Sequence, residues 1–190
     1  MLAGRAPEAL WLLEHPPVVT LGRRGGTVVG DARVEVVRTE RGGLATWHGP
    51  GQLVGYLVLH VAGRGGSVRG TVNALEQGII DWLRGQGVQA ARRERHPGVW
   101  VGKEKVCALG LHFRRGVSLH GFALNLSCDL AHYGQIVPCG ITDGGVTSLA
   151  ALTGAAPPVH EAAVTVGQAV RDALQSALPS THSDPHGPKP

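Results

Sequence analysis

Hydrophobic residues along the chain follow two different spacings, and the shorter of them predicts strands. Apolar or alternating runs, bounded by glycine and proline, predict strands at residues 8–14, 34–39, 44–48, 52–60, 98–102, 105–113 and 117–126. The first of these strands is expected to be buried and to end at the consecutive prolines Pro16 and Pro17, and a loop is expected from there through Gly25 and Gly26. The last two strands are joined by a hairpin-like turn at residues 114–116. This meander favours an antiparallel or mixed sheet.

Two stretches have the spacing of helices instead. Val72, Leu75, Ile79 and Leu83 recur at helical intervals and predict a helix over residues 69–84. Residues 158–178 place apolar side chains on one face, which predicts an amphipathic helix packed on the sheet. Residues 179–190 contain no aliphatic side chain, so we expect a disordered tail. The order of strands, helix, strands and helix predicts a single α/β (α+β) domain over residues 1–178.

Length and composition exclude several classes of protein. A chain of 190 residues suits one domain, and no apolar run approaches the roughly 20 residues that span a bilayer. The N-terminus lacks the pattern of a secretory signal, so we expect a cytoplasmic protein with no membrane partner. The net charge of +4 favours acidic partners weakly. Dispersed basic residues and only two Phe and two Tyr argue against nucleic acid, whereas an acidic protein partner remains compatible.

The three cysteines are the first candidates for chemistry. Their odd number and the lack of C-x-x-C spacing argue against disulfides and structural zinc, and the scattered histidines predict no metal site. Cys107 lies within an apolar strand and Cys128 at a strand end, as structural cysteines do. Cys139 stands between Pro138 and Gly140, in a predicted turn that would expose it. We therefore take Cys139 as the candidate nucleophile.

A cysteine nucleophile needs a group that favours its thiolate. Lys103 or Lys105 could lower the thiol pKa as a cation, or accept a proton when partly desolvated. His48 and His120, each followed by glycine, offer a Cys/His pair instead. The residues alone leave these alternatives open. Glycine is abundant, but no phosphate-binding loop motif is present, so nucleotide binding lacks direct support.

Six stretches in order along the chain resemble one family, the lipoyl(octanoyl) transferases. They are HPPVVTLG (15–22), RGGLATWHGPGQLVGY (41–56), HPGVWV (96–101), KVCALGLH (105–112), HGFALNLSCDL (120–130) and PCGITDGGVTSLA (138–150). The resemblance implies the fold of lipoate-protein ligases and of the biotin protein ligase catalytic domain, which is a mixed β-sheet flanked by helices.

The resemblance also implies roles for individual residues. Cys139 would be the acyl-thioester nucleophile, and Lys105, rather than Lys103, would lower its pKa and act as general acid and base. His120 is a possible supporting residue. The substrate-binding residues would be Arg41, Gly42, Gly43, Leu44, Ala45, Thr46, Trp47, His48, Ala108, Leu109, Gly110, Gly121, Phe122 and Ala123.

The activity that the resemblance implies is octanoyl (or lipoyl) transfer, the first step of endogenous lipoate biosynthesis. The donor would be octanoyl-acyl carrier protein. The acceptor would be a lysine of a lipoyl domain, in a 2-oxoacid dehydrogenase complex or the H protein of the glycine cleavage system. No cofactor or ATP is expected, because the acyl group arrives on the carrier's phosphopantetheine. The rivals are an ATP-dependent lipoate or biotin ligase, a non-catalytic carrier-binding or lipoyl-domain-binding module, and a papain-like hydrolase with His48 or His120 as base.

Overall fold

The computed structural model describes residues 7–29, 34–94, 96–136 and 144–178, and its centre is a mixed seven-stranded sheet. The sheet has the order β1-β5-β9-β8-β7-β6, with antiparallel neighbours throughout, and β10 pairs with β8 in parallel. Its strands are β1 (Ala9–Leu13), β5 (Gln52–Val58), β6 (Ala91–Arg92), β7 (Gly98–Val101), β8 (Glu104–Arg114), β9 (Val117–Asn125) and β10 (Gly145–Val146). The predicted mixed sheet is confirmed.

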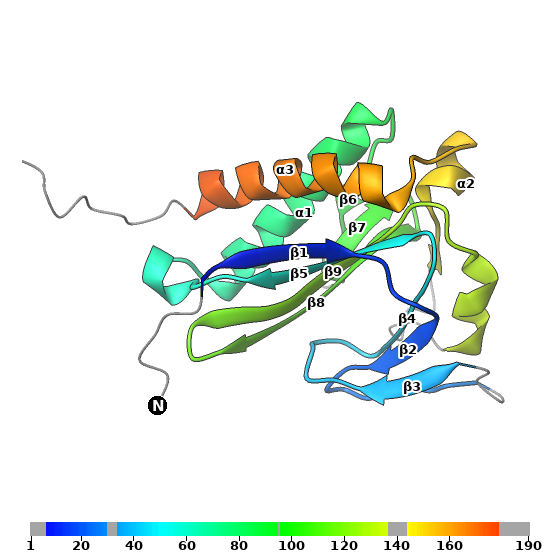
Figure 1. Cartoon of the computed structure of the whole chain (residues 1–190), viewed down its shortest axis with the longest axis horizontal. Helices are drawn as coiled ribbons and strands as arrows, with labels where there is room; N and C mark the ends of the chain where they lie inside the picture. The colour runs from blue at the N-terminus through cyan, green and yellow to red at the C-terminus, as the bar shows by residue number, and fades with distance from the viewer. Residues whose placement is uncertain (1–6, 30–33, 95, 137–143, 179–190) are drawn as a thin grey trace, which may run out of the picture.

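Two long helices cover one face of this main sheet (Figure 1). They are α1 (Val68–Gly85) and α3 (Val159–Ala177), which pack against each other and against β1, β5, β7 and β8. Leu75 and Ile79 of α1 and Val166 of α3 are fully buried in this layer. The Ser67 hydroxyl oxygen accepts a hydrogen bond from the Gly70 N–H (3.0 Å) and caps α1. Short helical turns occur at η1 (Ala62–Arg64), η2 (Leu130–Gln135) and α2 (Leu149–Thr153).

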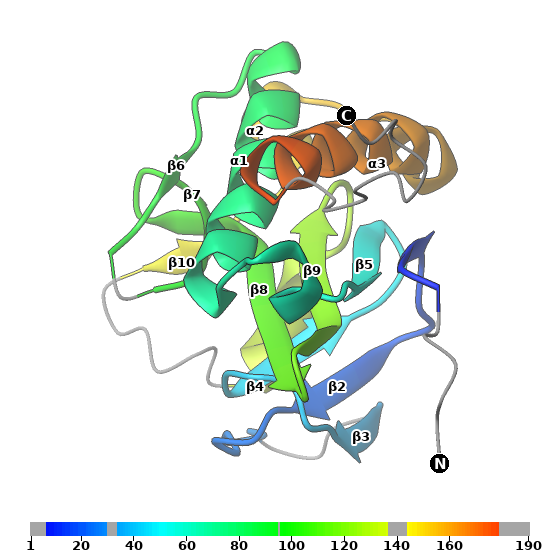
Figure 2. The same ribbon diagram turned by 90° about the vertical axis from the view of Figure 1, so that its left-hand side faces the viewer.

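A smaller three-stranded sheet lies on the side of the main sheet away from the helices (Figures 1 and 2). It has the order β3-β2-β4, formed by β2 (Val18–Leu21), β3 (Glu35–Arg38) and β4 (Ala45–His48). Val19, Ala45 and Trp47 pack with Tyr133 and Ile136 into a second core cluster. The fold therefore has three layers, with the main sheet between the helices and the small sheet.

Most predicted elements are confirmed, and two expectations are wrong. The predicted loop after the prolines contains β2, which pairs with a strand on each side and is the central strand of the small sheet. The first strand was expected to be buried, but among the described residues β1 is an edge strand that pairs with β5 alone, and Trp11 is 60% exposed. The predicted tail, residues 179–190, lies outside the described residues. Within the described residues, no helix is both long and apolar enough to cross a membrane.

Candidate active site

The face of the main sheet that looks toward the small sheet carries two rows of mostly small residues. The rows are Val54–Ala123–Ala108 and Tyr56–Gly121–Gly110, each running across β5, β9 and β8. Adjacent rows are two residues apart along a strand, about 7 Å. All six residues line a cavity of about 600 Å³, a volume that includes the part open to solvent. We call this space between the two sheets the central cavity.

A bulge in β8 brings Lys105 and Ala108 to the same side of the sheet. Residues three apart in a regular strand point to opposite faces. Here Val99 and Trp100 of β7 pair with Cys107 and Lys105 of β8, so one extra residue is inserted in β8. Val106 and Cys107 are both fully buried in the core beneath the helices, while Lys105 and Ala108 both line the central cavity.

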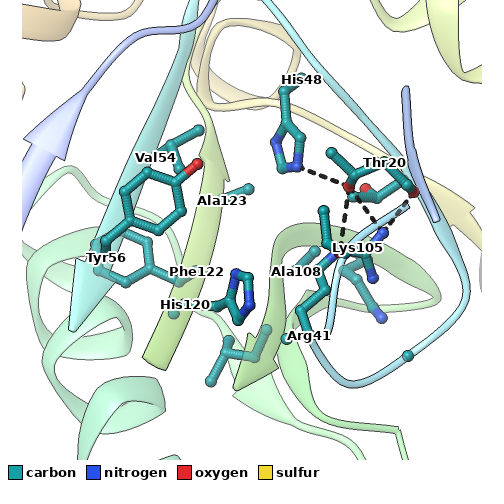
Figure 3. A pocket seen from close by; sticks show the side chains of 16 residues that line it. Thr20, Arg41, His48, Val54, Tyr56, Lys105, Ala108, His120, Phe122 and Ala123 are labelled. Carbon is teal, nitrogen blue, oxygen red and sulfur yellow. Dashed lines mark hydrogen bonds between the residues drawn. The ribbon is translucent and has the colours of Figure 1, made fainter. Parts of the chain in front are cut away.

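Arg41 covers the cavity from the side of the small sheet. Its side chain is 9% exposed, and its Nε and Nη2 atoms donate to the Thr20 hydroxyl (3.0 and 2.9 Å). Nη2 also donates to the Thr20 carbonyl oxygen (2.6 Å), as Figure 3 shows. The next residue, Gly42, donates its N–H to the Leu111 carbonyl oxygen (3.1 Å). A Cβ on Gly110 would lie 3.2 Å from both the Arg41 Cδ and the Gly42 carbonyl oxygen, so glycine allows this turn to close the cavity against β8.

A directional chain of buried hydrogen bonds leads from Asn125 to His48, which lines the cavity. Asn125 Nδ2 donates to the Thr147 carbonyl oxygen (2.9 Å), which leaves Asn125 Oδ1 as an acceptor. Oδ1 accepts from Gln52 Nε2 (2.8 Å) and from the Tyr133 hydroxyl (3.0 Å). The Gln52 Oε1 atom therefore accepts, and the His48 Nδ1 that lies 2.8 Å from it must carry a hydrogen.

The same chain fixes the other nitrogen of His48. The Thr20 hydroxyl already accepts from Arg41, so its hydrogen points to His48 Nε2, 3.2 Å away. His48 is thus the neutral tautomer protonated at Nδ1. Burial lowers the pKa of His48 to about 4; the hydrogen bond to Gln52 opposes this shift, and the charges of Arg41 and His15 add to it. The Thr20 hydroxyl donates its hydrogen to the lone pair of His48 Nε2. In this geometry His48 therefore has no free nitrogen that could accept a proton from a substrate.

Acid should therefore destabilise the fold through His48. The folded pKa of about 4 lies below the ordinary value of 6.5, so the unfolded chain binds the proton more readily. His48 contributes stability that is complete above pH 6.5 and is lost as the pH falls toward 4. Between pH 7 and pH 4.5 the loss of unfolding free energy through this group should be about 2 kcal/mol.

Urea unfolding of the wild type and of His48→Gln, at both pH values, measures this contribution. The variant keeps a neutral polar side chain, so its stability should fall less on acidification. Other groups whose pKa is lowered, such as the Glu8 carboxyl beside Arg64, are common to both proteins and cancel. An equal loss of unfolding free energy between pH 7 and pH 4.5 in the two proteins would contradict the prediction.

His120 lies beside the cavity in an unusual backbone conformation. Its φ is 61°, in the left-handed region that residues other than glycine seldom adopt. Burial lowers the pKa of its imidazole, and the charges of Arg41 and His112 lower it further, while Glu40 opposes them. His120 lines the central cavity (Figure 3). The structure therefore places this predicted supporting residue at the site.

Lys105 is a buried residue in the lining of the cavity. Its side chain is 8% exposed, and Nζ donates to the Pro97 carbonyl oxygen at 3.3 Å. Strand β10 pairs with the start of β8. Val146 lies opposite Lys105, and Thr147 donates its N–H to the Lys105 carbonyl oxygen (3.0 Å). Cys139 lies in the segment 137–143, outside the described residues.

The other two cysteines are in the core, as expected. Cys107 is fully buried and Cys128 is 5% exposed. Burial raises the pKa of both thiols, that of Cys128 to about 12. Neither thiol is therefore suited to act as a thiolate near neutral pH.

The structure brings most of the predicted site residues together. Those that line the central cavity are Lys105, Arg41, Gly43, Thr46, His48, Ala108, Leu109, Gly110, His120, Gly121, Phe122 and Ala123. Gly42, Leu44, Ala45 and Trp47 do not line it. Alternation along β4 explains this for Ala45 and Trp47, which face the second core cluster, whereas Thr46 and His48 face the cavity.

Among the described residues, sequence reasoning missed four that line the cavity: Thr20, Thr39, Val54 and Tyr56. Val54 and Tyr56 alternate within a correctly predicted strand, and pairing that strand with β9 would have found them. Thr20 lies in β2, which the sequence did not predict. No local signal marks Thr39.

Residues 1–171 match the family model of the lipoyl protein ligase A/B catalytic domain. The octanoyltransferase of Novosphingobium aromaticivorans is 52% identical over 155 residues, covering 78% of this chain and 70% of that protein. The octanoyltransferase of Geobacter sulfurreducens is 44% identical and covers 98% and 83%, respectively.

Solved structures of related folds superpose on the chain at low identity. The bipartite lipoate protein ligase of Thermoplasma acidophilum, studied with its E2 lipoyl domain, gives a TM-score of 0.66 at 16% identity, over 92% of this chain and 72% of that one. The biotin protein ligase of Aquifex aeolicus gives 0.54 at 16% identity, over 66% and 54%. These similarities bear on the fold, and the three-layer architecture agrees with them.

Proposed function

The chain belongs to the lipoyl protein ligase A/B catalytic domain family, and from this premise we propose that it is an octanoyltransferase of lipoate biosynthesis. The acyl donor is octanoyl-acyl carrier protein, and the acceptor is a lysine of a lipoyl domain. The lipoyl domain studied with the T. acidophilum ligase supports this class of acceptor. Proteins that carry such domains are 2-oxoacid dehydrogenase complexes and the H protein of glycine cleavage.

The observation that carries the proposal is the shape of the central cavity. Its floor consists of Ala108, Gly110, Gly121 and Ala123, whose small side chains leave room for an apolar chain along the sheet. Lys105 lies at the Ala108 end, and the Arg41 turn closes the Gly110 end. An octanoyl chain with its carbonyl near Lys105 would lie over the small residues and point toward Gly110.

In the first half of the proposed reaction, Cys139 takes the acyl group. Its thiolate, stabilised by the Lys105 ammonium, attacks the carbonyl carbon of the octanoyl thioester. A bond forms between this carbon and the Cys139 sulfur, and the bond to the phosphopantetheine sulfur breaks. The departing thiolate takes a proton from Lys105, which becomes neutral. One thioester replaces another, so no ATP or other cofactor is consumed.

In the second half, the acceptor lysine attacks the acyl-enzyme. Its neutral amine forms the amide bond, and the Cys139 sulfur leaves as a thiolate. The neutral Lys105 amine accepts the proton that the acceptor nitrogen loses, which restores the ammonium–thiolate pair. Backbone N–H groups along the glycine-rich strands are candidates to stabilise the oxyanion in both halves.

The test is octanoyl transfer in the absence of ATP. The full chain is incubated with octanoyl-acyl carrier protein and an isolated lipoyl domain, and intact mass spectrometry follows the lipoyl domain. We expect one octanoyl group on the domain without ATP, and none when free octanoate and ATP replace the donor. A lipoyl domain whose acceptor lysine is changed to arginine is the control and should stay unmodified.

Three results would contradict the proposal, one for each rival. Transfer that requires free octanoate and ATP would make the chain a ligase. Release of free octanoate from the donor without transfer would make it a hydrolase. Stable binding of the donor or of the lipoyl domain without any acyl chemistry would make it a binding module.

A further inference from the structure

The ring of Trp100 lies beside the Lys105 ammonium. Trp100 is opposite Lys105 in the pairing of β7 with β8, so the two side chains share a face of the sheet. Lys105 Nζ is 4.7 Å from the centroid of the Trp100 ring. We propose that Trp100 is a positioning residue, which holds Lys105 as an ammonium directed at the cavity. The inference rests on the role proposed for Lys105 and adds the residue that controls it.

The surroundings of Trp100 suit this role. Its side chain is 2% exposed, so the attraction between the ring and a cation is little screened by water. The indole Nε1 donates to the His96 carbonyl oxygen (3.1 Å), which fixes the orientation of the ring. Tryptophan is also the aromatic side chain that binds cations best. The ring and the Pro97 carbonyl oxygen together hold the ammonium.

The backbone bend that presents the Pro97 carbonyl is held in place from α1. Gly98 has a φ of 138° and donates its N–H to the buried Glu76 carboxylate (2.9 Å). Arg92 Nε lies 3.1 Å from the other Glu76 oxygen. A Cβ on Gly98 would lie 3.1 Å from the Lys105 Cε, so this glycine also packs against the lysine stem. Both the stem and the head of Lys105 are therefore positioned from the side of β7.

A second cation, the Arg93 guanidinium, lies against the Trp100 ring and provides a test of the proposal. The Arg93 guanidinium carbon is 5.0 Å from the same Trp100 centroid. The ring favours the charged form of Lys105, whereas the positive charge of Arg93 disfavours it. Removing the ring and removing the Arg93 charge should therefore have opposite effects on Lys105. Other charged or titratable groups near Lys105 or the Trp100 ring include the Glu76–Arg92 pair, His96 and Cys107, and Arg41, His48 and His120 line the same cavity.

The experiment reads the titration of Lys105 directly by NMR of side-chain-labelled lysine. The chain contains only three lysines, Lys103, Lys105 and Lys189, so the spectrum is simple, and Lys105→Arg assigns the signal. In Trp100→Leu we expect the titration midpoint of Lys105 to move down by roughly one pH unit. Trp100→Phe, which retains a ring, should show a smaller shift, and Arg93→Gln should shift the midpoint upward. The Lys103 signal is the internal control and should not move.

Opposite shifts separate an electrostatic role from simple packing. Midpoints that stay constant in all three variants, or that move in the same direction in Trp100→Leu and Arg93→Gln, would overturn the proposal. If Trp100→Leu does not fold, Trp100→Phe and Arg93→Gln still supply the comparison. The measurement does not depend on catalysis, so failure of octanoyl transfer in the wild type would contradict the proposed function without affecting this result.

Discussion

Replacing Cys139 with alanine is expected to lower octanoyl transfer to the lipoyl domain by about 10⁴-fold or more. Without the sulfur no acyl-enzyme can form, and the remaining cavity can only bring donor and acceptor together. The measurement is the initial rate of lipoyl-domain octanoylation at pH 7. In parallel, intact mass spectrometry of the enzyme after incubation with donor alone should show an octanoyl adduct in the wild type. Hydroxylamine should remove this adduct, because it cleaves thioesters.

Cys128→Ala is the matched control for this experiment. Burial raises the pKa of the Cys128 thiol to about 12, so this sulfur is not a thiolate at pH 7. The variant should retain the hydroxylamine-sensitive adduct and the transfer activity. The same sensitive adduct appearing undiminished in Cys139→Ala would place the nucleophile elsewhere in the chain.

The elements with long, regular patterns could be predicted from the sequence. Helix α1 has clear helical spacing and buries Leu75, Ile79 and Leu83 where that spacing requires. Strand β2 could not be predicted in the same way. Its four residues follow Pro17 directly, and its pattern is completed only by β3 and β4, which come later in the chain. Pairing with distant strands, rather than local preference, makes it a strand.

The candidate site could be predicted only in part, for a related reason. The segment 41–48 was correctly associated with the cavity, but its residues alternate between the cavity and the second core cluster. In a regular strand, the spacing of Lys105 and Ala108 would place their side chains on opposite faces of the sheet. The bulge opposite Val99 and Trp100 is what brings them to the same face. Tyr56 reaches the site through its pairing with Gly121, 65 positions later in the numbering. Sequence motifs identified the segments, and the register of the sheet decides which side chains take part.

The second large effect is expected at Lys105, where two substitutions should separate the two halves of the reaction. Lys105→Met keeps the length of the side chain and removes its charge and its proton. At pH 7 we expect this variant to transfer octanoyl roughly 10²- to 10⁴-fold more slowly than the wild type. Part of the acylation rate should return as the pH approaches ~8.5, where an ordinary cysteine ionises without help.

Lys105→Arg should have a different effect, because a guanidinium supplies charge but does not deprotonate in proteins. The thiolate of Cys139 would still be favoured, and the departing phosphopantetheine thiolate would take its proton from water instead of from residue 105. The acyl-enzyme should therefore form and then accumulate, since no neutral amine is present to accept the proton from the acceptor lysine. Mass spectrometry of the enzyme during turnover measures this accumulation.

Lys103→Met is the control for both substitutions. Lys103 is exposed and lies two residues away from Lys105, so its replacement should not affect either half of the reaction. Equal rates for the wild type and Lys105→Met would exclude Lys105 from the chemistry. Equal rates of acyl-enzyme formation in Lys105→Arg and Lys105→Met would mean that a positive charge at position 105 does not by itself favour the Cys139 thiolate.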